Sequence, residues 1–475
     1  MSVFVASLFL SLLPAAVEPS GYCVVVSEAT HKDPAWKGVV EALVAKHHAE
    51  TVPYRSSVDE ALGTLQTRHP RYVCFVAQPG EATRDFVARV SRLMRGLDDD
   101  PYPDALWGIL TGSDAACALR IARQTAPLEI HRVAAGTEIA LSACDEGVWY
   151  CELNQGKMVR KERGREPRES RGPPDTTQAL ADALNGFRAQ LFVTSGHATE
   201  RDWQIGYRYR NGQFRSAGGQ LYGLDTAGKR YDVRSDNPKV YLPVGNCLMG
   251  HIDGADAMAL AFLNSAGVCQ MIGYTVPTWY GYGGWGLLDY FVEQPGRYSL
   301  AEAFFVNQVA LTHRLEKYFP GAGAEAPAGS RPRLELSAEA RAVGLTANDA
   351  RGLLYDRDTV AFYGDPGWVA RMAPGPLRWQ QSLDVQGDRY RFTIRPQCGA
   401  QSFQPVNTNG SQRGGRPIVQ LLPRRIDASR VKVVAGAELA PVIADDFVLV
   451  PLPRPAETPA EYQVLFHAPP TGPTP

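Results

Sequence analysis

Two short apolar runs in this chain each end in a glycine, and each glycine is followed by a residue that could do covalent chemistry. The run LFVTSG (191–196) leads directly to His197, and the run VYLPVG (240–245) leads through Asn246 to Cys247. A cysteine attacks a carbonyl as its thiolate, which is populated near neutral pH when an imidazole lies beside it. A histidine and a cysteine at neighbouring strand ends would supply that pair, and the glycines would leave backbone N–H groups free to face a developing oxyanion.

Each residue taken alone has a simpler explanation. A free cysteine in an apolar run is usually a small buried hydrophobe, and a lone histidine after a glycine is usually structural. The pair is more informative than either member, because both residues occupy the same place in a repeated strand pattern. We therefore predict a catalytic dyad of His197 and Cys247, with packing as the alternative.

The elements that must position this pair are strands that alternate with helices. Strand-like runs such as YCVVVS, RYVCFVA and ALWGIL are each followed by a segment with helical spacing, and the alternation resumes near residue 176 and continues to about residue 317. This alternation predicts an α/β fold with a mainly parallel sheet and helices on both faces. In open α/β sheets, chemistry collects where loops leave the carboxyl ends of the strands. His197 and Cys247 are expected there.

The helical pattern stops after Ala373. Short, evenly spaced strand candidates follow, broken by glycine and proline: RYRFTIRP, PIVQLLP, VKVVAG, FVLVPL and EYQVLFHA. They predict a small all-β sandwich. The expected organisation is a signal peptide over 1–18, an N-terminal α/β subdomain over 19–150, a catalytic α/β subdomain over 151–373, a β-sandwich over 374–468 and a disordered tail over 469–475.

Composition limits the classes of function. The chain has 475 residues and is 44% hydrophobic, with 49 Lys and Arg against 50 Asp and Glu, so nothing draws it generally to nucleic acid or anionic lipid. The apolar N-terminal stretch is too short to span a bilayer and resembles the apolar part of a signal peptide, which predicts a secreted or periplasmic protein. No other segment is long enough to be a transmembrane helix. The basic stretch over 157–171 is expected to be a solvated, mobile loop.

Eight cysteines in a chain of this length do not indicate a disulfide framework. Cys23, Cys74 and Cys269 lie inside apolar runs and are expected in the core. Cys144 and Cys151 flank a short segment, and their spacing leaves open whether they pair.

Three motifs make the chain resemble the gingipain-type cysteine peptidases, relatives of caspases and legumains. They are SGH at 195–197, the stretch CLMGHIDGADAMALAFLNSAGVCQMIGYT that begins at Cys247, and VAFYGDPGWVARM at 360–372. The resemblance implies a caspase-like sheet, a cysteine endopeptidase activity on protein or peptide substrates, and an immunoglobulin-like C-terminal domain. It also implies an oxyanion hole made by the backbone N–H groups of Ala198 and Cys247. Close relatives usually have glycine in place of Ala198 and a small apolar residue in place of Asn246.

The resemblance extends to substrate choice. The segment DPYPDALWGIL, which begins at Asp100, is similar to a pattern of the arginine-specific gingipains, and the match would place Asp100 in a pocket that accepts Arg or Lys. The alternative is that Asp100 only caps an acidic turn before Pro101. Trp279, in the glycine-rich aromatic stretch TWYGYGGWG, matches a pocket-lining tryptophan of the family. An aromatic core cluster is the alternative for Trp279.

No cofactor is expected. His251, Asp253 and Asp256 lie close to Cys247 in the sequence, but no HExxH or CxxC pairing accompanies them, so we do not predict a zinc site. Calcium as a structural ion is compatible with exported members of the family. A rival function for the whole chain is a non-catalytic, exported binding or surface module that keeps the peptidase fold.

Overall fold

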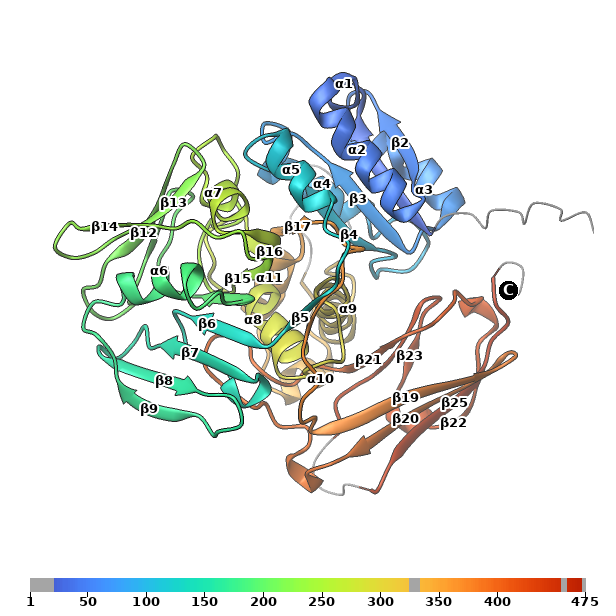
Figure 1. The fold of residues 1–475 in the computed structure, drawn as a ribbon. Helices are drawn as coiled ribbons and strands as arrows, with labels where there is room; N and C mark the ends of the chain where they lie inside the picture. Colours follow the sequence, from blue (N-terminus) through green and yellow to red (C-terminus); the bar gives the residue numbers. More distant parts are fainter. Residues whose placement is uncertain (1–20, 324–333, 454–458, 472–475) are drawn as a thin grey trace, which may run out of the picture.

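The computed structural model describes residues 21–323, 334–453 and 459–471. Its centre is a twelve-stranded sheet with the order β2-β1-β3-β4-β17-β16-β15-β10-β6-β7-β8-β9 (Figure 1). The strands of this sheet are β1 Tyr22–Ser27, β2 Glu50–Tyr54, β3 Tyr72–Val76, β4 Leu106–Leu110, β6 Arg132–Ala135, β7 Glu146–Tyr150, β8 Lys157–Lys161, β9 Arg168–Arg171, β10 Leu191–Thr194, β15 Lys239–Pro243, β16 Val268–Tyr274 and β17 Val360–Gly364. The predicted signal peptide lies outside the described residues.

Helices and smaller sheets surround the central sheet. The helices are α1 Glu28–Lys32, α2 Pro34–His47, α3 Leu62–Arg68, α4 Arg84–Leu93, α5 Ala115–Ala122, α6 Thr177–Asn185, α7 Met258–Ser265, α8 Tyr282–Leu287, the π-helix η3 Leu288–Val292, α9 Leu300–Tyr318, α10 Ala338–Ala342 and α11 Ala347–Arg357. β11 Asp202–Gln204, β12 Gln213–Ala217, β13 Gln220–Leu224 and β14 Arg230–Asp232 form a four-stranded sheet, and β5 Leu128–Ile130 pairs with β18 Ala370–Met372. Among the described residues, no helix combines the length and apolar character needed to cross a membrane.

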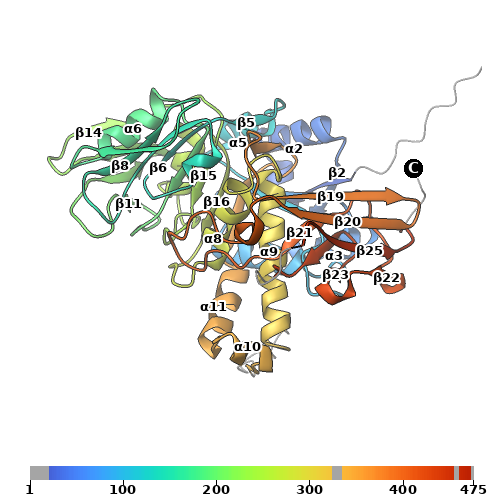
Figure 2. The same ribbon diagram turned by 90° about the horizontal axis from the view of Figure 1, so that it is seen from below.

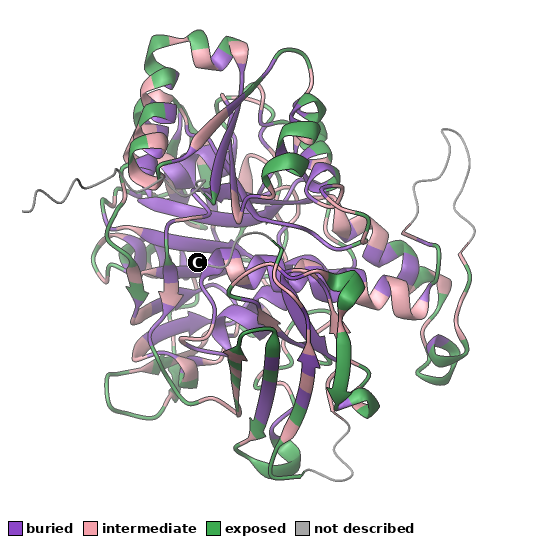
Figure 3. Ribbon diagram, turned by 90° about the vertical axis from the view of Figure 1, so that its right-hand side faces the viewer, coloured by how far each residue is buried: buried purple, intermediate pink, exposed green. Residues whose placement is uncertain are grey.

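Apolar residues explain why the central strands form. Every residue of β1, β4, β10, β15, β16 and β17 is buried, so both faces of the middle of the sheet are covered (Figure 3). Such continuously buried strands are typical of parallel sheets. Helix starts are also local in origin: Ser299 and Glu302 form a reciprocal capping box at the start of α9, where the sequence predicts a helix from Ser299. The predicted mainly parallel sheet is confirmed.

Strand direction reverses inside this sheet. Neighbouring strands from β2 to β17 run parallel, β17 runs antiparallel to β16, and β16, β15, β10, β6 and β7 again run parallel to one another. The carboxyl ends of β10, β15 and β16 therefore lie at the same edge as the amino ends of β4 and β17. β6 and β7 pair with the β10 side, so these two strands belong to the same half of the sheet as β10.

Several local predictions need correction. The basic stretch 157–171 is not a loop: β8 pairs antiparallel with β7, and β9 pairs with β8, so it forms a hairpin that extends the sheet. The side chains of β9 are exposed, which explains why its composition resembles a loop. Cys144 and Cys151 are both buried and unpaired, and Cys23, Cys74 and Cys269 are buried as predicted.

The C-terminal region contains two antiparallel sheets that share a core. One sheet has the order β19-β20-β25-β22 and the other β21-β24-β23. Their bounds are β19 Trp379–Gln386, β20 Arg389–Pro396, β21 Ile418–Leu421, β22 Lys432–Ala435, β23 Val442–Ile443, β24 Phe447–Val450 and β25 Tyr462–His467. An immunoglobulin-like topology for this sandwich stays a prediction.

Side chains on β24 alternate between two cores. Val448 and Val450 face the core of the C-terminal sandwich, whereas Phe447 and Leu449 belong to the large core of the α/β region. Because successive side chains of a strand point to opposite faces, β24 contributes side chains to both cores.

The predicted disordered tail also needs correction. The backbone N–H of Asp427 donates to the carbonyl of Pro469 at 2.9 Å, and that of Thr471 donates to the carbonyl of Arg425 at 3.1 Å. Residues 469–471 are therefore held against the sandwich, while 472–475 lie outside the described residues.

Candidate active site

His197 and Cys247 follow two neighbouring strands. β10 and β15 are parallel, and their last paired residues are Thr194 and Pro243. His197 comes three residues after Thr194, and Cys247 comes four residues after Pro243. Because adjacent strands lie about 4.8 Å apart, the structure brings the two predicted dyad loops together at one edge of the sheet.

The buried side chain of Asn246 joins these two loops. Its Oδ1 accepts a hydrogen bond from the hydroxyl of Thr194 at 2.6 Å, and its Nδ2 donates to the carbonyl of Gly196 at 3.0 Å. Thr194 and Gly196 precede His197, and Asn246 precedes Cys247. The asparagine that departs from the family pattern therefore fixes the cysteine loop to the histidine loop.

The turn before the cysteine is closely packed. A Cβ atom at Gly245 would lie 2.6 Å from Oγ of Ser195 and 2.9 Å from the indole of Trp285, so only glycine fits there. Leu248, directly after the cysteine, has a φ of 57°, in the left-handed region. Such backbone strain costs about 1–3 kcal/mol for a residue other than glycine and is typical of functional sites.

The sulfur of Cys247 is half-buried and lies under the loop that follows β16. The backbone N–H of Thr278 donates to Sγ at 3.2 Å, and the hydroxyl of Thr278 donates to the carbonyl of Asn246 at 3.0 Å. The thiol in turn donates to the carbonyl of Thr278, with Sγ 3.8 Å from the oxygen. Cys247 therefore has the access and polarity of a reactive thiol, whereas Cys23, Cys74 and Cys269 are core residues.

His197 is exposed and its ring stacks on Tyr207, with ring centroids 4.7 Å apart and an angle of 30° between the planes. Within the described residues, no hydrogen bond joins a ring nitrogen of His197 to Sγ of Cys247. Catalytic contacts are often long before substrate binds and shorten in the complex. The imidazole thus lies open to solvent, on the loop that Asn246 ties to the cysteine loop.

Ala198 has a free backbone donor. It forms a bridge with Trp203 whose hydrogen bonds run from Gln204 N–H to the carbonyl of His197 and from Thr199 N–H to the carbonyl of Asp202. This pattern leaves the N–H of Ala198 without a protein acceptor in the described part of the chain. An oxyanion needs such a donor.

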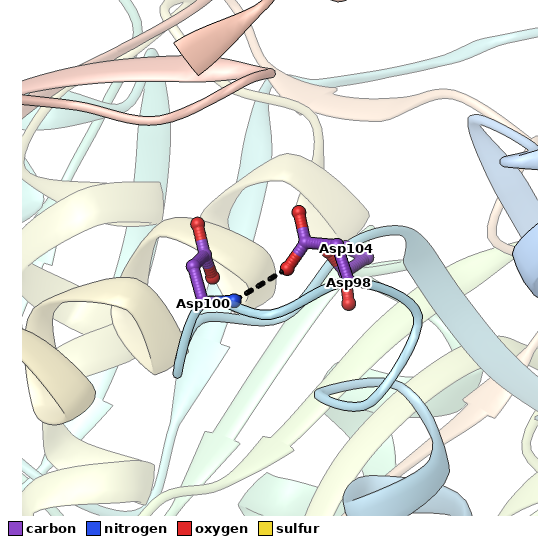
Figure 4. Close-up of side chains that lie close together, drawn as sticks. All are labelled: Asp98, Asp100 and Asp104. Atoms are coloured by element: carbon purple, nitrogen blue, oxygen red, sulfur yellow. Dashed lines mark hydrogen bonds between the residues drawn. The ribbon is translucent and has the colours of Figure 1, made fainter. Parts of the chain in front are cut away.

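Asp100 lies in an acidic turn before β4, at the sheet edge that also carries Cys247. The N–H of Asp100 donates to Asp98 at 2.8 Å (Figure 4). A carboxylate oxygen of Asp100 accepts from the N–H of Tyr102 at 2.7 Å. The turn-capping contact proposed as the alternative role of Asp100 is therefore present. The pocket role stays a prediction.

Asp98, Asp100 and Asp104 place ligand oxygens within 4.8 Å of one another. Burial, together with the charge of Asp98, raises the pKa of Asp100 to about 6 and that of Asp104 to about 9. An all-carboxylate donor set fits a hard cation such as the predicted calcium. Asp104 is therefore protonated near neutral pH, and the guanidinium of Arg425 already donates to the backbone carbonyl of Asp104.

Trp279 lies on the rim of the site. It is 47% exposed and contacts Tyr280 and Tyr355, with ring centroids 5.6 and 5.8 Å away. Burial raises the pKa of Tyr355, and the negative charge of Asp356 adds to the effect. An exposed Trp279 is not a core residue, and its contact with substrate stays a prediction.

The acidic residues after Cys247 have other partners. Asp253 pairs with Arg201 at 2.5 Å, and Asp256 accepts a hydrogen bond from the N–H of Gly218 at 2.6 Å. Both carboxylates therefore pair with residues in and around strands β11 and β12.

Sequence reasoning missed Glu152, which follows β7 at the same edge of the sheet. It is 6% exposed, its Oε1 accepts from the hydroxyl of Thr137 at 2.7 Å, and its Oε2 has no partner among the described residues. Its carbonyl accepts the N–H of Tyr207, the residue that stacks on His197. Burial raises the pKa of Glu152. The signal was available, because Glu152 follows the strand EGVWY as His197 follows its own strand.

Comparison with known proteins gives distant structural neighbours. No protein-family model and no curated protein matches the chain. The crystal structure of the Arg-specific cysteine proteinase gingipain R aligns with a TM-score of 0.46 and 10% identity over 97% of this chain and 100% of that chain. A complex of the pro- and mature domains of RgpB from Porphyromonas gingivalis aligns with a TM-score of 0.43 and 10% identity over 95% and 100%. At this distance no residue role is transferred.

Replacement of Asn246 by alanine should destabilise the protein. The change removes the contacts to Thr194 and Gly196 and leaves buried polar groups unpaired, at a cost of about 1–3 kcal/mol in the free energy of unfolding. Urea titration measures this loss. Asn264→Ala, which removes a single half-buried bond to the carbonyl of Gly219, is the control and should cost less. An Asn246→Ala protein as stable as the Asn264→Ala protein would contradict the bridging role.

Replacement of Asp104 by asparagine should flatten the pH dependence of stability. The native pKa of about 9 lies above the unfolded value near 4, so the native state holds a proton that the unfolded state releases. The stability that this carboxyl contributes is therefore present below about pH 4 and lost as pH rises towards 9. Urea unfolding at pH 5, 7 and 9 with a chelator present tests this. Asp99→Asn, on the exposed side of the same turn, should keep the wild-type slope.

Proposed function

We propose that this chain is a cysteine peptidase in which Cys247 is the nucleophile and His197 transfers the protons. The observation that supports it best is the pair of adjacent parallel strands β10 and β15, because the loops that follow them carry His197 and Cys247 and are tied together by Asn246. The hydrogen bond from the N–H of Thr278 to Sγ adds to this, because it fixes the position of the sulfur.

In the proposed mechanism, the imidazole of His197 takes the thiol proton, and the Cys247 thiolate attacks the carbonyl carbon of the scissile bond. The oxyanion accepts hydrogen bonds from the backbone N–H groups of Ala198 and Cys247. The imidazolium then gives its proton to the leaving amine, and an acyl group remains on sulfur. His197 next removes a proton from water, which hydrolyses the thioester and restores the thiol.

Tyr207 and Glu152 would orient the histidine. The carbonyl of Glu152 fixes the N–H of Tyr207, and the Tyr207 ring stacks on His197. A stacked ring restricts rotation of an exposed imidazole without blocking its nitrogens.

A preference for basic side chains is the finer part of the proposal. The three carboxylates of the Asp98–Asp104 turn lie at the edge that carries the dyad, and an incoming guanidinium would relieve their mutual repulsion. The contact of Asp100 with Tyr102 supports the competing role as a turn cap. Kinetic measurements on basic and neutral substrates separate the pocket role of Asp100 from its role as a turn cap.

Labelling with an arginine-containing peptide electrophile tests the dyad. We expect an adduct on Cys247 in the wild type, none in a folded Cys247→Ala protein, and labelling slowed by orders of magnitude in His197→Ala, because the thiolate loses its base. Mass spectrometry of peptides locates the adduct. Cys398→Ala is the control, since Cys398 is an exposed thiol away from the dyad. A His197→Ala protein that reacts at the wild-type rate from about pH 5 to 9 would remove His197 from the mechanism.

Asp100→Asn should raise KM for Arg substrates more than for neutral ones. Removal of one close charge pair costs a few kcal/mol, on the order of a hundredfold. Fluorogenic peptides with Arg or Leu before the scissile bond measure the ratio, and Asp99→Asn provides an exposed neighbour as control. If Asp100 only caps its turn, the ratio of basic to neutral cleavage will stay at its wild-type value.

A further inference from the structure

A segment of the C-terminal region leaves the sandwich and packs inside the α/β region. Residues 406–416, here called the inserted segment, lie between β20 and β21 and contact α8 and η3. Figure 2 shows chain in the orange-red of the C-terminal region beside α8. The sequence gives no sign of this excursion beyond its content of glycine and asparagine.

Buried ion pairs anchor the inserted segment on η3. Nε of Arg413 donates to Asp289 at 2.7 Å, and its Nη2 donates to Glu293. Nε of Arg416 donates to the second oxygen of Asp289 at 3.0 Å, and the guanidinium stacks on the Tyr282 ring with Cζ 3.5 Å from the centroid. All four charged side chains are at most 7% exposed, so these are paired charges in a low-dielectric environment.

Gly410 of the inserted segment is connected to the cysteine loop through contacts with a tryptophan. Gly410 has a φ of 100° and packs so closely on the indole of Trp285 that a Cβ atom there would overlap the ring. The other edge of the same indole lies under Gly245, at 2.9 Å from a Cβ built there. Gly410, Trp285 and Gly245 thus form a contact chain that ends two residues before Cys247.

Asn409, the residue before Gly410, is connected to the histidine loop through hydrogen bonds. Nδ2 of Asn409 donates to the hydroxyl of Thr137 at 3.0 Å, and that hydroxyl donates to Glu152 at 2.7 Å. Glu152 holds the N–H of Tyr207, whose ring stacks on His197. This second chain of contacts begins one residue from the first and reaches the other member of the dyad.

We propose that the inserted segment sets the relative position of His197 and Cys247, with Asn409 and Gly410 as positioning residues. The inference rests on the proposed function of the dyad. Arg413 and Arg416 hold the segment by contacts that do not touch the dyad loops, so a change at Asn409 or Gly410 is transmitted to the loops and does not release the segment. The C-terminal domain therefore completes the active site.

The first test compares substitutions at two glycines of the inserted segment. Gly410→Ala places a methyl group against Trp285, whereas Gly415→Ala, at a φ of 65° with nothing within 4 Å, adds the same atom in open space. We expect Gly410→Ala to lower kcat by about tenfold to a hundredfold at little changed KM, because a displacement near 1 Å costs that much. Gly415→Ala should keep the wild-type kcat.

Alkylation of Cys247 by iodoacetamide separates this inference from the proposed function. Peptide mapping gives the rate at Cys247, and the exposed Cys398 serves as an internal reference in the same sample. Gly410→Ala should change the Cys247 rate relative to Cys398 even if the wild type cleaves no peptide tested. A wild type without peptidase activity would overturn the proposed function, whereas a folded Gly410→Ala protein with wild-type alkylation would overturn the positioning role.

Asn409→Ala is the second variant, and it tests the positioning role of the inserted segment if Gly410→Ala does not fold. It cuts the link to Thr137, and the exposed Thr408→Ala is its control. We expect Asn409→Ala to lower kcat about tenfold and to displace the imidazole step in the pH profile of Cys247 alkylation, while Thr408→Ala leaves both unchanged. A purely structural role would lower thermal stability and leave that pH profile in place. An Asn409→Ala profile that coincides with the wild type would overturn the proposal.

Discussion

The side chain of Asn246 is the interaction on which the candidate site depends. Parallel pairing brings β10 and β15 together, but a strand pair alone does not fix the loops beyond its last hydrogen bond. Asn246 continues the connection past the strand ends by contacts with Thr194 and Gly196. Because the amide is buried and both of its polar ends are paired, the two loops share one rigid unit.

The reversal of strand direction gives this edge of the sheet its electrostatic character. Carboxyl ends of β10, β15 and β16 bring His197, Cys247 and Trp279, and the amino end of β4 brings the three carboxylates of the Asp98–Asp104 turn. A sheet parallel throughout would have placed that turn at the opposite edge. The acidic turn and Cys247 lie at the same edge of the sheet for a topological reason.

Local patterns predict much of this, and long-range contacts account for what they miss. The start of α9 at Ser299 and the positions of His197 and Cys247 after apolar strands follow from periodicity, capping and glycine placement. The hairpin of β8 and β9 was missed because β9 is exposed and polar along its whole length and so has no apolar face. Glu152 and the inserted segment depend on partners more than fifty residues away, such as Tyr207 for the former and Asp289 for the latter, and no sequence window contains both partners.

The alternating faces of β24 have a consequence for how the molecule folds as a whole. Phe447 and Leu449 contribute to one core while Val448 and Val450 contribute to the other, so loss of this strand opens both cores at once. Domains joined by a mobile linker melt in separate steps, but two cores that share a strand lose their structure together. The α/β region and the sandwich are thus expected to unfold as a single cooperative unit, and neither is a module that recombination could exchange without a replacement for the shared strand.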